Sequence, residues 1–230
     1  MRETFRLFKM KIEIESNIIR CLLKDVYFVN GTAYAGKSTM VKLLSEKYNG
    51  ICCGENYHDA LMDAIDPVHQ PNLSYFDTMS DWQEFISRTP EEYDTWSTGV
   101  SREAAELEIA MLLQLAVRGQ KIFVDTNIPV PILKEISDFH HVAILLSPQS
   151  MSVDRFFHRE DPEKQFLLRK IQEAPDPAAA MENFRNCIAK VNSPEHYREF
   201  AESGLYTYIR TEESTLESAL QQIEKHFELI

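Results

Sequence analysis

The sequence predicts an α/β fold, in which a parallel sheet carries helices on both faces. Short apolar runs that are typical of buried strands alternate along the chain with longer amphipathic stretches of helical spacing. A glycine-containing loop joins the first buried run, 26–30, to the first amphipathic stretch, 38–48. The length of 230 residues suits a single domain, 1–230, that has room for a cap.

The individual elements follow in order from the same patterns. An alternating run at 9–15 predicts a half-exposed strand, so residues 1–25 are expected to form an edge strand or a hairpin with the chain before Val26. The expected buried strands are 26–30, 51–53, 121–125, 141–146 and 206–209. The expected helices are 38–48, 101–118, 132–139 and 216–229, with further helical sequence between 150 and 203 that prolines interrupt.

Residues 55–100 combine prolines, many acids and a high share of aromatic residues, which predicts a cap of short helices and loops. Ser101 is the expected N-cap of the long helix that follows, and Gly119 is expected to end that helix. The aromatic residues Trp82 and Trp96 suit either the packed core of the cap or stacking on a planar ring, and so does Tyr57.

Composition and charge exclude several classes of function. The formal net charge of −12 argues against a nucleic acid or an anionic membrane as the main partner. No apolar run reaches the length of a membrane span, and the N-terminus lacks the apolar core of a signal peptide. The four cysteines have no zinc-site spacing, so a reducing cytoplasm is the expected location. The predicted edge strand could pair with the same strand of a second copy of the chain, which would form a homodimer.

The loop after the first strand has the pattern G-x-x-x-x-G-K-[ST]. Successive backbone N–H groups of such a loop, with the positive end of the following helix, can surround a polyphosphate. Lys37 would reach the β and γ phosphates of ATP, and the Ser38 hydroxyl would ligate Mg²⁺. The residues expected to bind the nucleotide are Gly31, Thr32, Ala33, Tyr34, Ala35, Gly36, Lys37, Ser38 and Thr39.

A carboxylate at the end of a later strand supplies the second expected metal ligand. Asp125 follows the apolar run 121–124 and fits the residue that helps to hold Mg²⁺, although a lone aspartate there also suits a turn cap. The next residue is Thr126 rather than an acid that would activate water, and no Asn-Lys-x-Asp element for guanine is present. Both absences favour transfer of the phosphoryl group to a bound acceptor.

Transfer requires cations over the moving phosphoryl group and exclusion of water. Arg155 and Arg159 lie four residues apart, hence on one face of a helix, and are expected to close over that group as catalytic residues. Arg169, further along, is a weaker candidate for the same role. The alternative for these arginines is a solvated face that pairs with nearby acids.

The turn after the second strand offers carboxylates that would orient a hydroxyl acceptor and take its proton. Asp59 is the first choice for this catalytic role and Glu55 the second, although Asp59 also suits a helix cap. Arg88 and Arg102 are the cations that would bind an acidic group of the acceptor.

With these residues in place, the chain resembles the P-loop small-molecule kinases of the nucleoside-monophosphate-kinase-like group. This group includes shikimate, gluconate and adenylate kinases and chloramphenicol phosphotransferase. The resemblance rests on Gly31–Ser38, on Asp125 and on Arg155-x-x-x-Arg159. It implies a three-layer P-loop NTPase fold with five parallel strands, a substrate-binding cap at 55–100 and a lid at 150–170. No shikimate-type or adenylate-type substrate motif is found between 55 and 100.

The expected function is therefore an ATP-dependent phosphotransferase that moves the γ-phosphate of Mg-ATP to a hydroxyl of a small molecule. Two alternatives remain at this stage. One is a nucleoside monophosphate kinase, whose acceptor is itself a phosphate, and the acidic composition of 55–100 disfavours it. The other is a nucleotide-binding switch with slow turnover.

Overall fold

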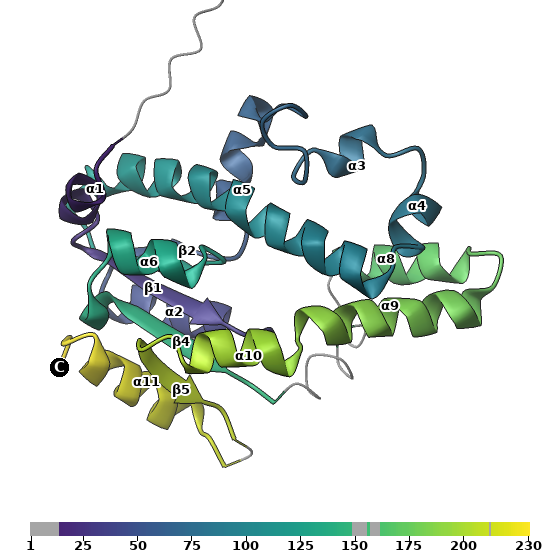
Figure 1. Ribbon diagram of the computed structural model, residues 1–230. Coiled ribbons are helices and arrows are strands. Elements are labelled where there is room, and N and C mark those ends of the chain that lie inside the picture. The colour runs from purple at the N-terminus through teal and green to yellow at the C-terminus, as the bar shows by residue number, and fades with distance from the viewer. Residues whose placement is uncertain (1–13, 149–155, 157–161, 212) are drawn as a thin grey trace, which may run out of the picture.

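The computed structural model describes residues 14–148, 156, 162–211 and 213–230 (Figure 1). Its centre is a sheet of five strands that are all parallel, in the order β2-β3-β1-β4-β5. The strands are β1 (Val26–Gly31), β2 (Ile51–Cys53), β3 (Ile122–Asp125), β4 (Val142–Leu146) and β5 (Tyr206–Ile209). Each lies within a residue of its predicted position, because each is a short apolar run.

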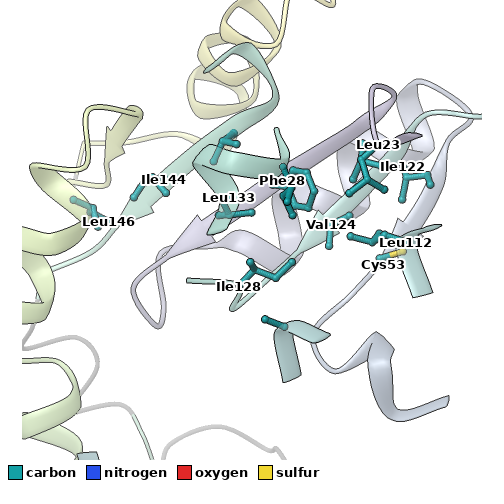
Figure 2. Packing of buried hydrophobic residues seen from close by; sticks show 14 residues of the cluster. Leu23, Phe28, Cys53, Leu112, Ile122, Val124, Ile128, Leu133, Ile144 and Leu146 are labelled. Carbon is teal, nitrogen blue, oxygen red and sulfur yellow. The ribbon is translucent and has the colours of Figure 1, made fainter. Parts of the chain in front are cut away.

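Successive residues of a strand point to opposite faces of the sheet, and each face has its own core. Val26 and Phe28 of β1 point to the face that Figure 2 shows, where they pack with side chains such as Leu112 and Leu133. Tyr27 and Val29 point to the other face. The strands are thus buried on both sides, as in other parallel sheets covered by helices.

Helices cover both faces, as the sequence predicts (Figure 1). One face carries α2 (Lys37–Lys47) and α11 (Leu216–His226), through side chains such as Leu44 and Ile223. The other face carries α5 (Pro90–Ala116), α6 (Val130–Ile136) and α10 (Pro194–Ala201). The α/β class and the parallel sheet are therefore confirmed.

A third apolar cluster lies beyond the sheet and forms the core of a helical cap. Phe85, Phe184 and Ile171 are buried at its centre. The cluster joins segments that are far apart in sequence, and they lie together in Figure 1. The remaining elements are η1 (Tyr57–Ala64), α3 (Tyr75–Thr78), α4 (Trp82–Ile86), η2 (Phe139–His141), α8 (Pro162–Gln172) and α9 (Pro177–Val191).

Two expectations about the elements require correction. The long helix begins at Pro90 rather than at Ser101, because Thr89 and Glu92 form a capping box and Pro90 occupies the first turn. The chain just before Val26, which is predicted to pair in a hairpin with residues 9–15, forms a helix, α1 (Ser16–Leu22). Most of the predicted strand at 9–15 lies outside the described residues.

Within the described ranges, no helix is both long and apolar enough to cross a membrane. The 27-residue helix α5 has the length, but acidic and basic side chains recur along it. This agrees with the absence of a long apolar run in the sequence.

Candidate active site at the end of the first strand

The glycine-containing loop leaves β1 through a turn that only glycine fits. Gly31 has a φ of +125°, and a Cβ atom there would overlap the carbonyl oxygen of Leu145 on the neighbouring strand β4. The side chain of Asn30 reinforces the turn, because its oxygen accepts from the Gly31 N–H at 2.6 Å while its amide donates to Ile128 O at 2.7 Å. Gly31 is thus required by the contact between two strands, before any ligand is considered.

Groups that follow the neighbouring strands β4 and β5 fix the course of the loop, which we call the arc. The Ser147 hydroxyl, just after β4, donates to Ala33 O at 2.7 Å, and the Ser147 N–H donates to the Thr32 hydroxyl oxygen at 2.8 Å. Arg210, just after β5, donates to Tyr34 O at 2.9 Å. Tyr34 itself has a φ of +65°, which residues other than glycine seldom adopt. The shape of the arc is therefore set by contacts on both sides.

Three chemically important groups meet below this arc. Lys37 Nζ lies 3.3 Å from Gly31 O, 3.4 Å from Thr32 O and 4.0 Å from Asp125 Oδ1. The Ser38 hydroxyl donates to Asp125 Oδ2 at 2.6 Å. Asp125 is 4% exposed and pairs in register with Val29 of β1, so the sheet places it directly beside the loop.

Helix α2 begins beneath the loop without a side-chain cap. Its N-cap is Gly36, whose φ of +94° is left-handed, and no side chain accepts a hydrogen bond there. The positive end of the helix dipole and the N–H groups of its first turn therefore face the loop. A Cβ atom at Gly36 would meet no described atom within 4 Å, so its positive φ, and not a close contact inside the protein, favours glycine at this position.

A cleft of about 360 Å³ opens above these groups. The loop residues 31–34 and 36–39 line one side of it, and Ala35 lies buried beneath them. The remaining wall comes from strand ends and from the cap and α10, and includes Glu55, Ser97, Asn127, Lys164, His196 and Tyr197. A cleft at the carboxyl ends of parallel strands is the common position for a ligand site in this class of fold.

Only one of the four residues predicted to bind the acceptor lines the cleft. Glu55 lines the cleft, whereas Asp59 is exposed in η1 and lies outside the cleft wall. Arg102 is exposed on α5 and also lies outside it. Arg88 belongs to a separate hollow in the cap, where its guanidinium stacks on the Tyr75 ring at 3.9 Å.

The predicted lid arginines, Arg155 and Arg159, lie outside the described residues and stay predictions. Arg169 lies on α8 and lines an apolar cavity of the cap instead of the cleft. Lys164, in the first turn of the same helix, does line the cleft, although it is not among the residues that the sequence predicts for the site. Its spacing gives no signal, because only the fold of the cap brings α8 over the loop.

A buried carboxylate behind the strand end is the other residue that the sequence did not reveal. Glu108 of α5 is 2% exposed and accepts from the Thr126 hydroxyl at 2.5 Å and from the Tyr57 hydroxyl at 3.2 Å. Burial raises the pKa of Glu108 to about 7, although hydrogen bonds from Thr126 and Tyr57 act in the opposite direction. In the sequence, Thr126 is notable only because it is not an acid. In the structure its hydroxyl holds Glu108, a second buried carboxylate beside Asp125.

His58 completes this buried group. Its Nδ1 lies 3.8 Å from Glu108 Oε1 and has no hydrogen-bond partner among the described residues. Burial lowers the pKa of His58, so the imidazole is neutral at pH 7. The neutral histidine therefore gives Glu108 no compensating charge.

The donor set at the loop fits magnesium bound together with phosphates. A serine hydroxyl and a carboxylate are hard oxygen ligands, and Mg²⁺ in nucleotide sites takes few ligands from the protein. The described part of the chain has no cluster of three or more His, Cys, Asp or Glu side chains that would hold a metal alone. Comparisons of this chain with protein-family models, with curated proteins and with solved structures find no match.

Proposed function

We propose that this protein is a P-loop kinase, which transfers the γ-phosphoryl group of Mg-ATP to a hydroxyl of a small molecule. One observation carries the proposal. Lys37 Nζ and the Ser38 hydroxyl both lie within 4.0 Å of the carboxylate of Asp125, which comes from a segment far away in sequence. Phosphoryl transfer depends on such an arrangement of a cation, a metal-binding hydroxyl and a carboxylate.

In the proposed complex, the N–H groups of the loop and of the first turn of α2 hold the phosphate oxygens. Lys37 Nζ turns from the carbonyls of Gly31 and Thr32 to the β and γ phosphates. Ser38 and Asp125 hold Mg²⁺, which supplies charge neutralisation at the phosphates. Lys164 faces the same cleft from the cap and adds a second protein cation on the opposite side.

The transfer step needs a proton acceptor for the hydroxyl. The hydroxyl oxygen forms a bond to the γ-phosphorus while the bond from this phosphorus to the β–γ bridging oxygen breaks, and ADP leaves with the bonding electron pair. Glu55 takes the hydroxyl proton in this scheme, because it lines the cleft and Asp59 does not. The absence of an acid after Asp125 continues to favour an acceptor other than water.

The proposal is tested by following the label from γ-labelled ATP in the presence of Mg²⁺ and a panel of hydroxyl-bearing metabolites. We expect label in one class of acceptor, and a loss of roughly 100-fold or more in Lys37→Ala. Lys42→Ala is the matched control, since Lys42 is exposed on the same helix and lies outside the cleft.

A further variant separates binding from transfer. Lys164→Ala should slow transfer but leave the dissociation constant of ATP within a few-fold of the parent value. The reason is that the glycine-containing loop and the first turn of α2 provide most of the proposed contacts to the nucleotide. Release of inorganic phosphate at one slow rate, whatever acceptor is added, would contradict the kinase and favour a switch. Equal losses in Lys37→Ala and Lys42→Ala would contradict the site itself.

A further inference from the structure

A second cavity, of about 700 Å³, lies in the helical cap between α4, the start of α5 and α8. We call it the aromatic pocket, because more than half of the residues that line it are aromatic, namely Phe76, Trp82, Phe85, Tyr93, Trp96, Phe156 and Phe166. Its volume falls in the range of cavities that hold small organic ligands. It therefore has the size and the apolar lining of a ligand site.

The rings of the wall support one another. Phe85 and Trp96 meet edge to face with centroids 4.9 Å apart, and Trp82 meets Phe166 in the same way at the same distance. Phe76 stacks on Trp82 at 5.1 Å. Ring contacts of this kind hold the wall in fixed orientations, so a flat guest would meet preformed aromatic edges and faces.

The aromatic pocket adjoins the cleft at the glycine-containing loop. Phe156 and Lys164 line both cavities. A molecule in the aromatic pocket would therefore reach the phosphate end of the cleft past these two side chains. Among the described residues of the pocket wall, the cations Lys164 and Arg169 outnumber the one acid, Glu163, whereas the chain as a whole carries −12.

We propose that the aromatic pocket seats the phosphoryl acceptor, and that this acceptor is a small aromatic compound bearing a hydroxyl and one negatively charged group. The inference rests on the proposed kinase function for the transfer step, but the binding it requires does not depend on ATP. The ring packs among the aromatic side chains, Lys164 and Arg169 face the charged group, and the hydroxyl projects towards the cleft. The hydroxyl oxygen then bonds to the γ-phosphorus, ADP leaves with the electron pair, and Glu55 takes the proton.

The chain contains its own reporter for this binding. It has two tryptophans, Trp82 and Trp96, and both line the aromatic pocket. Trp96 also lines the separate hollow that contains Arg88, whereas Trp82 does not. Tryptophan fluorescence therefore reports binding in the cap, and the Phe166→Ala variant assigns that binding to the aromatic pocket. The probe is 4-(hydroxymethyl)benzoate, excited where the probe does not absorb. Its saturated counterpart, 4-(hydroxymethyl)cyclohexanecarboxylate, has the same hydroxyl and carboxylate on a ring that is not flat.

We expect a saturable fluorescence change with the benzoate and a dissociation constant at least tenfold higher for the cyclohexane compound. Phe166→Ala should weaken benzoate binding roughly tenfold or more, because it removes one wall and leaves both tryptophans in place. Phe139→Ala is the matched control, since Phe139 is 47% exposed in η2 and lies outside both cavities. Circular dichroism and a thermal melt of each variant establish that it is folded.

The inference is overturned if the two rings bind equally well, or if millimolar benzoate produces no saturable change in the folded parent protein. An undiminished affinity in folded Phe166→Ala would overturn it as well. Failure of the kinase proposal looks different: benzoate would bind, in Lys37→Ala as in the parent, but no label would pass to it or to any other acceptor. Label found in an aliphatic acceptor alone would retain the kinase and refute the aromatic pocket.

Discussion

Replacing Glu108 by glutamine should make the protein more stable at alkaline pH, and the structure gives the size of the effect. Glu108 is buried, and its pKa is raised from an ordinary value of 4.5 to about 7, mainly by loss of solvent. An acid whose pKa is raised in the folded state keeps its proton there after the unfolded chain has released it. Folding stability is therefore lost as the pH rises.

The sign and the pH window follow from these two values. Below pH 4.5 both states hold the proton, and the full stability is present. Between pH 4.5 and pH 7 the unfolded chain ionises while the folded chain does not, so the free energy of unfolding falls, and above pH 7 this loss is complete. The gap corresponds to about 3 kcal/mol in total, of which about 2 to 3 kcal/mol falls between pH 5 and pH 8.

Glu108→Gln keeps the shape of the side chain and an oxygen that can accept from Thr126 and Tyr57. The parent protein should lose about 2 to 3 kcal/mol more than this variant between pH 5 and pH 8, because other titrating groups cancel in the difference. Urea unfolding at both pH values measures it. Glu106→Gln, exposed on the same helix, is the control and should follow the parent protein.

The reasoning is refuted if the stability of Glu108→Gln falls with pH as steeply as that of the parent protein. Glu108 would then be ionised in the folded state throughout this range, and burial would not govern its charge. If the free energy of unfolding falls more with pH in the parent protein and in Glu106→Gln than in Glu108→Gln, the effect is assigned to the buried carboxylate.

Two further predictions concern the backbone. Gly31→Ala should cost about 3 kcal/mol or more, because a Cβ atom there meets the Leu145 carbonyl, whereas Gly119→Ala, with a φ of +65° and open space, should cost only about 1 kcal/mol. Equal losses in urea unfolding would contradict the contact with β4. Thr89→Ala should cost about 1 kcal/mol by removing the capping box with Glu92, and a thermal melt unchanged from the parent protein would refute this.

The sheet was predictable from sequence because each strand is a short apolar run with a clear boundary. Buried strands in a parallel sheet need no long-range information to be recognised. The start of α5 is harder to recognise, because Pro90 stands in a proline-containing segment that favours loops, although Thr89 and Glu92 have the spacing of a capping box. The capping-box spacing predicts a helix start at this point, but the nearby prolines favour a loop.

The candidate site was predictable in the same local sense and no further. The loop from Gly31 to Ser38 is contiguous, and Asp125 stands at a strand end, so topology alone brings them together. Lys164 and Glu108 lie on helices whose positions depend on packing between distant segments, and no local pattern records that. The aromatic residues of 75–96 were open to two interpretations, and their packing with α8 is what defines a cavity among them.

The length of α5 has a mechanical consequence. Its 27 residues form one uninterrupted rod of about 40 Å, with Tyr93 and Trp96 at the aromatic pocket, Ser97 at the cleft and Glu108 behind the strand end. The distance along the helix from the pocket wall at Trp96 to Glu108 is thus fixed by helical geometry, and Glu108 is hydrogen-bonded to Thr126, the residue after Asp125. Substitutions in the first turns of α5 would change the wall of the aromatic pocket, while the later turns stay packed on the sheet, so the shape of the pocket and the stability of the sheet can be altered separately along a single helix.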